Sequence, residues 1–77
     1  MEELIKTIVK PLVDFPDDVL VTIHEEDTRI VYQLSVHKND MGKVIGKQGR
    51  VAKAIRTVVY AAASKSLKKK TYLEIKE

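Results

Sequence analysis

The sequence has no cysteine and no tryptophan, and its 77 residues include only two histidines. The lack of cysteine excludes disulfides, thiolate metal sites and a cysteine nucleophile. The two histidines, His24 and His37, do not have the spacing of metal ligands, and neither a carboxylate pair nor a serine–histidine arrangement accompanies them. We therefore expect no metal site, no cofactor and no enzymatic activity.

The sequence also lacks any apolar run near the roughly 18 residues that a membrane helix needs. Its first residues, Met1-Glu2-Glu3, are acidic where a secretion signal would be basic, so we expect a cytoplasmic protein that is not inserted in a membrane. A chain of this length forms one domain, residues 1–77, with a small core. Small domains commonly gain stability from disulfides, metals or partner chains, and here only a partner chain is left.

The charged residues are unevenly distributed along the chain. Residues 1–37 carry three basic and eight acidic side chains, whereas residues 38–77 carry eleven basic and three acidic ones. An asymmetry of this kind indicates that one side of the domain faces a polyanion. The alternative is an ordinary solvated surface rich in lysine.

Hydrophobic periodicity predicts a helix and a hairpin in the first half of the chain. The helix covers residues 2–13 and is expected to bend near Lys10, because Pro11 cannot donate a helical hydrogen bond. Alternating residues predict strands over 19–24 and 29–37, paired antiparallel.

Two helices and a strand are predicted in the second half. Asn39 or Asp40 can cap a short helix that ends near Ile45, and a long helix over 50–66 and a strand over 71–75 follow. A strand–helix–helix–strand crossover places its two strands in parallel. The prediction is an α+β fold of order α-β-β-α-α-β, in which three helices cover one face of a three-stranded mixed sheet.

All three glycines, Gly42, Gly46 and Gly49, lie within eight residues. The segment Gly46-Lys47-Gln48-Gly49 falls between the two predicted helices, where glycine permits a tight turn and close backbone approach. The start of the next helix offers N–H groups and partial positive charge to a phosphate. Neither the Walker loop nor the dinucleotide-binding glycine motif has this spacing. An ordinary helix-turn-helix corner is the alternative interpretation.

Two segments carry a specific family resemblance: IVKPLVD at 8–14, and DMGKVIGKQGR at 40–50 with its continuation AKAIRTVV at 52–59. The G-x-x-G loop between two helices resembles the KH fold in its type II arrangement. The whole chain resembles the small bacterial KhpA family, with an N-terminal helix over 1–14 and a KH core over 28–77. The basic segment 65–70 departs from the family pattern and would add nonspecific affinity for RNA.

The resemblance implies a function in RNA biology. It implies an RNA-binding protein and RNA chaperone that forms homodimers or pairs with KhpB (also called Jag or EloR), a larger multi-domain KH protein. It also implies a link to cell elongation and peptidoglycan homeostasis. The competing interpretation is a protein-interaction module, in which the KH fold serves docking rather than RNA binding.

We predict that single-stranded RNA lies beside the glycine loop, the long helix and the second strand. Loop residues, flanking cations and one apolar residue under the bases form the predicted site: Gly46, Lys47, Gln48, Gly49, Lys43, Arg50, Lys53 and Ile45. Neutralising four phosphates of a single strand predicts a salt slope of about −3. Base stacking is expected to contribute little, because Tyr32 and Tyr72 are predicted to be half-buried structural residues.

The long helix has more apolar residues than one buried face requires. One face of this helix is predicted to carry Val51, Ala54, Ile55, Val58 and Ala62. A surplus stripe through Val58, Val59 and Ala62 is the predicted dimer interface. Burial of all these residues within one chain is the alternative, and the family resemblance favours the dimer.

Overall fold

A computed structural model describes residues 1–66 and 69–76, without the side chains of residues 65 and 66. Within this part of the chain, four short 3-10 turns accompany the main helices and strands. The main elements are α1 (Glu2–Val9), β1 (Leu20–Glu25), β2 (Arg29–Ser35), α2 (Met41–Ile45), α3 (Arg50–Ser66) and β3 (Lys70–Lys76). The predicted order α-β-β-α-α-β is confirmed.

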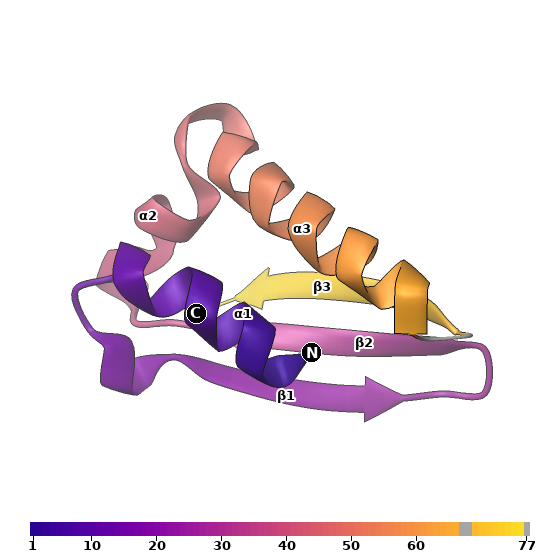
Figure 1. Ribbon diagram of the computed structural model, residues 1–77. Coiled ribbons are helices and arrows are strands. Elements are labelled where there is room, and N and C mark those ends of the chain that lie inside the picture. The colour runs from indigo at the N-terminus through magenta and orange to yellow at the C-terminus, as the bar shows by residue number, and fades with distance from the viewer. Residues whose placement is uncertain (67–68, 77) are drawn as a thin grey trace.

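The three strands form one mixed sheet with β2 in the centre. β1 pairs antiparallel with β2, starting from Leu20 opposite Ser35, and β2 pairs in parallel with β3, starting from Arg29 opposite Lys70. The helices lie over one face of this sheet (Figure 1). The predicted α+β class, hairpin and parallel crossover are therefore confirmed.

The first helix ends where Pro11 interrupts it. α1 stops at Val9, and Lys10–Leu12 continues as a 3-10 turn with the proline near its start, where no N–H group is needed. Ile5 and Val9, four residues apart, are both fully buried. The predicted break near Lys10 is confirmed, and the buried face of α1 packs on β1 and α3.

The core lies between the helices and the sheet. Its fully buried apolar side chains come from both layers and are Ile5, Val9, Leu34, Val44 and Val59. Tyr32 also belongs to this core, and its burial raises the pKa of its hydroxyl, helped by the negative charges of Glu2 and Glu25. Tyr32 is thus more deeply buried than predicted.

The buried face of α3 is offset from the apolar face that the spacing predicted. Buried positions recur at the spacing of one helical face and are Ala52, Ile55, Val59 and Ala63. Ala54 and Val58, predicted to share one face with Ile55, are exposed, with 48% of Val58 accessible. Both stripes are apolar, so periodicity alone could not decide which of them faces the sheet.

Candidate nucleic-acid interface

The loop between α2 and α3 depends on backbone conformations that favour glycine. Gly46 has φ 75° and Gly49 has φ 74°, both in the left-handed region, and Gln48 joins them with φ 59°. A Cβ on Gly46 would clash with Cγ2 of Val51 and would lie 2.9 Å from the backbone nitrogen of Val51. Gly46 therefore allows both the turn and the close approach of α3, whereas a Cβ at Gly49 would meet open space.

The loop leaves two backbone amides without a protein acceptor. The Gly46 amide donates to the carbonyl of Gly42 at 2.9 Å, and the Gly49 amide donates to that of Gly46 at 3.2 Å. The amides of Lys47 and Gln48 make no hydrogen bond within the described residues. The Gly49 amide is therefore already used by the turn, and two amides are left for an anion.

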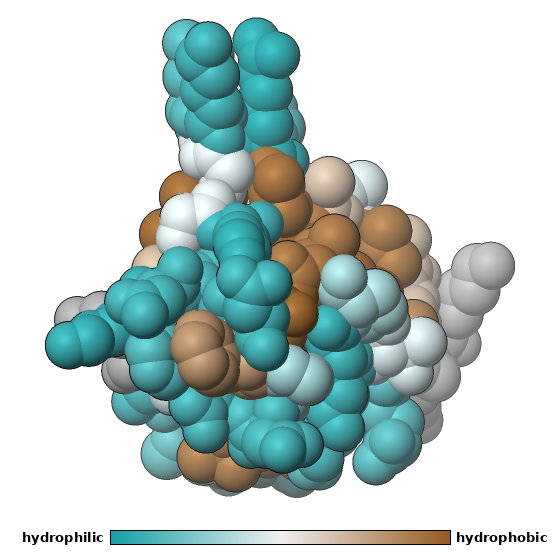
Figure 2. Space-filling model, turned by 90° about the vertical axis from the view of Figure 1, so that its left-hand side faces the viewer, coloured by the Kyte–Doolittle hydropathy of each residue, from teal (hydrophilic) through white to brown (hydrophobic). Residues whose placement is uncertain are grey.

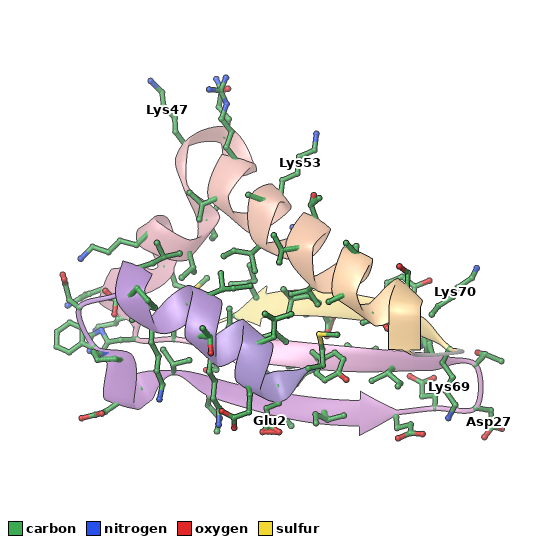
Figure 3. All side chains as sticks on the ribbon, viewed as in Figure 1. Glu2, Asp27, Lys47, Lys53, Lys69 and Lys70 are labelled. Carbon is green, nitrogen blue, oxygen red and sulfur yellow. The ribbon has the colours of Figure 1, made fainter. Side chains whose placement is uncertain are left out.

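Cationic side chains surround these amides. Lys47, Arg50 and Lys53 are exposed, and Lys47 and Lys53 point away from the sheet (Figure 3). The guanidinium of Arg50 donates weakly to the Gln48 side chain at 3.4 Å. Hydrophilic side chains project from the end of the molecule above a hydrophobic patch (Figure 2). Ile45 is 37% exposed at the end of α2, directly before the loop.

Lys43 differs from the other predicted cations because its ammonium is engaged within the protein. It donates a hydrogen bond to the carboxylate of Asp14 and lies 3.7 Å from Oδ1 of Asp40. The hydrogen bond to Asp14 raises the pKa of Lys43; burial acts against it and the two carboxylates reinforce it. Lys43 stays charged, but a phosphate would have to compete with Asp14 for it.

Asp40 has a structural role that the sequence analysis missed. Asn39 or Asp40 was predicted to cap α2, but the Asp40 side chain makes no capping hydrogen bond there. Instead it accepts hydrogen bonds from the amides of Asp14 and Phe15 at 3.1 and 3.0 Å. Burial by itself would raise the pKa of Asp40, but these two bonds, Lys43 and His37 outweigh it and keep the pKa below the ordinary 3.8. The fully buried carboxylate thus ties the loop after α1 to the start of α2.

Replacing Asp40 with asparagine is expected to lower the melting temperature at pH 7, because one amide loses a charged acceptor. Since the pKa of Asp40 is lower in the folded state, its contribution to stability is complete above about pH 4 and is lost as the pH falls through the folded pKa. The difference in melting temperature between wild type and Asp40→Asn should therefore narrow as the pH falls below about 4. Thermal unfolding followed by circular dichroism at pH 7 and pH 3 measures both differences.

Asp14→Asn is the matched control, because the Asp14 side chain is 70% exposed and the change removes only the charged partner of Lys43. Its melting temperature should stay close to that of wild type. Equal melting temperatures for Asp40→Asn and wild type at pH 7 would contradict the role given to Asp40.

The outer edge of β3 is occupied by side chains of α3. Nε of Arg56 donates to the carbonyl of Leu73 at 3.1 Å, and the amide of Leu73 donates to the hydroxyl of Tyr60 at 3.2 Å. Arg56 follows Lys53 by one turn and so continues the cationic side of α3 towards β3. Its three-residue spacing from Lys53 was a usable sequence signal, although Arg56 was not among the predicted site residues.

The basic segment 65–70 is described only in part. Residues 67 and 68 and the side chains of 65 and 66 lie outside the described residues. Lys69 donates to the carboxylate of Glu25 at 2.8 Å and to the carbonyl of Glu26 at 2.9 Å, which ties this segment to the β1–β2 hairpin. Lys70 is exposed beside it (Figure 3).

A separate apolar groove of about 330 Å³ lies between α1 and α3. We call it the α1/α3 groove. It is lined by Ile8, Leu12, Arg50, Val51, Ala54, Ile55 and Val58. Val59, predicted at a dimer interface, has no exposed surface, because its side chain points into the chain's own core. Val58 is exposed and Ala62 is partly exposed, so both keep surface for a partner.

Among residues 1–66 and 69–76, no cluster of three or more histidine or acidic side chains is placed to hold a metal ion. No helix in the same part of the chain is long and apolar enough to cross a membrane.

The element order, the parallel β2–β3 pair and the G-x-x-G loop between two helices define a KH domain of type II. Solved structures agree on the fold. Two structures of Era superpose with TM-scores of 0.72 and 0.73 at 22% identity; each match covers 96% of this chain and 28% of Era. The first is Era from Aquifex aeolicus with GDP·AlF4⁻, and the second is a complex with MgGDPNP and nucleotides 1506–1542 of 16S ribosomal RNA.

The chain belongs to the KhpA/KhpB family of KH domains, whose sequence profile matches residues 2–75. RNA-binding protein KhpA of Listeria monocytogenes is 66% identical over the full length of both chains. RNA-binding protein KhpA of Bacillus subtilis is 62% identical over 69 residues, which cover 90% of this chain and 85% of the relative. The predicted family is confirmed, and with it the prediction that the chain is not an enzyme.

Proposed function

We propose that this chain binds single-stranded RNA through the Gly46–Gly49 loop and acts in the cytoplasm as an RNA chaperone and post-transcriptional regulator. The observation that carries the proposal is the pair of unoccupied amides, on Lys47 and Gln48, at a projecting tip surrounded by cations. Backbone amides at the start of a helix favour phosphate oxygens. The relatives named RNA-binding proteins, with identities above 60%, support the same ligand.

The loop and α3 suggest how a strand is held. The two amides and Lys47 contact one phosphate, and Arg50 and Lys53 neutralise those that follow along α3. Gly46 and Gly49 shape the turn, and Ile45 provides apolar contact under a base. Lys43 contributes only as an outer cation, because Asp14 holds its ammonium. Three available cations predict a salt slope of about −2, smaller than the −3 expected with Lys43 included.

A second candidate function, docking of protein partners, is favoured by the α1/α3 groove. Small domains with exposed apolar surface gain stability by covering it, and this groove lies next to the exposed side chain of Val58. We propose that it holds a second copy of the chain, with Val58 and Ala62 in the interface, or a KhpB (Jag/EloR)-like KH protein. The proposed link to cell elongation and peptidoglycan homeostasis rests on the family resemblance.

The double change Lys47→Asp, Gln48→Asp is expected to weaken RNA binding more than ten-fold, because it sets two carboxylates beside the amides that would hold a phosphate. Gln48 and Lys47 are exposed, so the fold should persist. Fluorescence anisotropy of labelled single-stranded RNA at several salt concentrations measures affinity and slope, and circular dichroism checks folding.

The control is Thr7→Glu, Lys10→Glu, which changes the net charge equally at exposed positions of the first helical segment. It should bind RNA nearly as wild type does. Equal loss in both variants would mean that overall charge, not the loop, determines binding. Unchanged binding of the loop variant would refute the loop site and favour the docking function.

A further inference from the structure

The face of the sheet opposite the helices carries a hollow of about 360 Å³ that the loop site does not use. No element covers this face in the described part of the chain (Figure 1). Val31 of β2 forms its floor and is only 9% exposed. The side chains around the floor include His24, Arg29, Gln33, Tyr60, Tyr72 and Glu74.

Tyr72 offers an aromatic ring on this open face. The strand register places His24, Val31 and Tyr72 in one row across the sheet, so the imidazole and the phenol ring flank the valine. Tyr72 is 42% exposed, which agrees with the predicted half burial and leaves part of its side chain open to a ligand. Aromatic rings that stand on an open sheet are the platforms on which RNA-binding sheets stack bases.

Polar groups beside Tyr72 are arranged to read a base edge rather than a phosphate. Nε2 of His24 donates to Oε1 of Gln33 at 3.2 Å, and the amide nitrogen of Gln33 donates to Oε1 of Glu74 at 3.1 Å. These bonds fix the Gln33 amide and leave Oε2 of Glu74 without a partner among the described residues. A carboxylate repels phosphate but accepts a hydrogen bond from a base amino group.

The hollow is continuous with the helix that carries the loop. Tyr60 of α3 lines it and reaches over the edge of β3, where its hydroxyl accepts the Leu73 amide. Arg50, next to the loop, and Tyr60 are ten residues apart, which is about 15 Å along a helix. Stacked nucleotides advance about 3.4 Å each, so about four of them separate the loop from this edge.

We propose that the open-face hollow binds one further base of the same RNA strand. This base stacks on Tyr72, and its exocyclic amino group donates a hydrogen bond to Glu74. The base is adenine, cytosine or guanine, because uracil has no exocyclic amino group to give. This inference rests on the proposed RNA binding at the loop. With this further base, the RNA-binding site would be longer than the stretch of about four nucleotides that a KH loop holds.

The test compares short and long RNA by NMR chemical-shift titration, using tetra- and deca-adenylate and deca-uridylate. Tyr72→Ala should weaken deca-adenylate binding roughly five-fold or more, the loss of one stacked base, and leave tetra-adenylate unchanged. Tyr72→Phe should behave as wild type. Wild type should prefer deca-adenylate to deca-uridylate, and Glu74→Ala should reduce that preference. Tyr72→Trp, in a chain without other tryptophan, should lose fluorescence with the decamer only.

The outcomes separate this inference from the proposed function. Tetramer and decamer binding that both depend on the loop, with no effect of Tyr72→Ala and no quenching in Tyr72→Trp, would overturn the inference and leave the loop site standing. Failure of wild type to bind either length would remove the proposed function and the inference together. Loss of a protein partner in Tyr72→Ala, with RNA binding intact, would make this face a docking surface and overturn the inference as well.

Discussion

Gly46→Ala is expected to destabilise the domain by several kcal/mol and to abolish RNA binding. The backbone at Gly46, with φ 75° and ψ 175°, lies in a region that is nearly exclusive to glycine and costs other residues about 1–3 kcal/mol. The new Cβ would also lie 2.9 Å from the backbone nitrogen of Val51, so α3 itself would have to move. A domain of this size has only about 4–12 kcal/mol of total stability.

The other two glycines provide an internal series. Gly49→Ala is expected to cost about 1–2 kcal/mol, because φ is 74° but the added Cβ meets open space. Gly42→Ala, inside α2 with nothing within 4 Å, should stabilise the domain by about 0.5–1 kcal/mol. Urea unfolding of the three variants measures the order. A Gly46→Ala variant as stable as wild type would contradict the close packing of the loop on α3.

Val58→Glu is expected to convert a dimer into a folded monomer. Val58 is 48% exposed in the α1/α3 groove, so a glutamate there can point to water in the isolated chain. In the proposed interface between two copies, the same glutamate would be buried against apolar surface, which is strongly unfavourable. Sedimentation equilibrium measures the mass, and circular dichroism confirms that the variant is folded.

Val59→Glu is the adjacent control with the opposite expectation. Val59 is fully buried against the chain's own core, so the charge would remove most of the about 4–12 kcal/mol of stability and leave an unfolded chain. The two substitutions lie at adjacent positions on α3. They differ in whether a partner chain or the chain's own core covers the side chain. A wild type that is monomeric at all concentrations would refute the proposed interface.

Much of the fold was predictable because it depends on local pattern. Alternating apolar residues defined the two hairpin strands, the Pro11 position ended α1, and the strand–helix–helix–strand order required a parallel pair. The loop was predictable for the same reason, since glycines three residues apart between two helices allow the positive φ values that a tight turn needs.

Other features could not be predicted because they depend on contacts between distant parts of the chain. Asn39 or Asp40 was expected to cap α2, but the Asp40 carboxylate reaches the amides of Asp14 and Phe15, about 25 residues away in sequence. Lys43 was expected to be available for RNA and is instead paired with Asp14. Both outcomes follow from the position of the loop after α1, which only packing determines.

The sequence by itself determined the order of the elements, the family, and the glycine loop with its cations, because periodicity, turn residues and short-range motifs act locally. The tertiary structure decided which of two apolar stripes on α3 became core and which became surface. It also decided that Tyr72 stands exposed on the open sheet while Tyr32, its neighbour by one register position, is buried. The physical reason is that the side of a helix or strand that is covered depends on the neighbours that pack against it, and those neighbours come from distant parts of the chain.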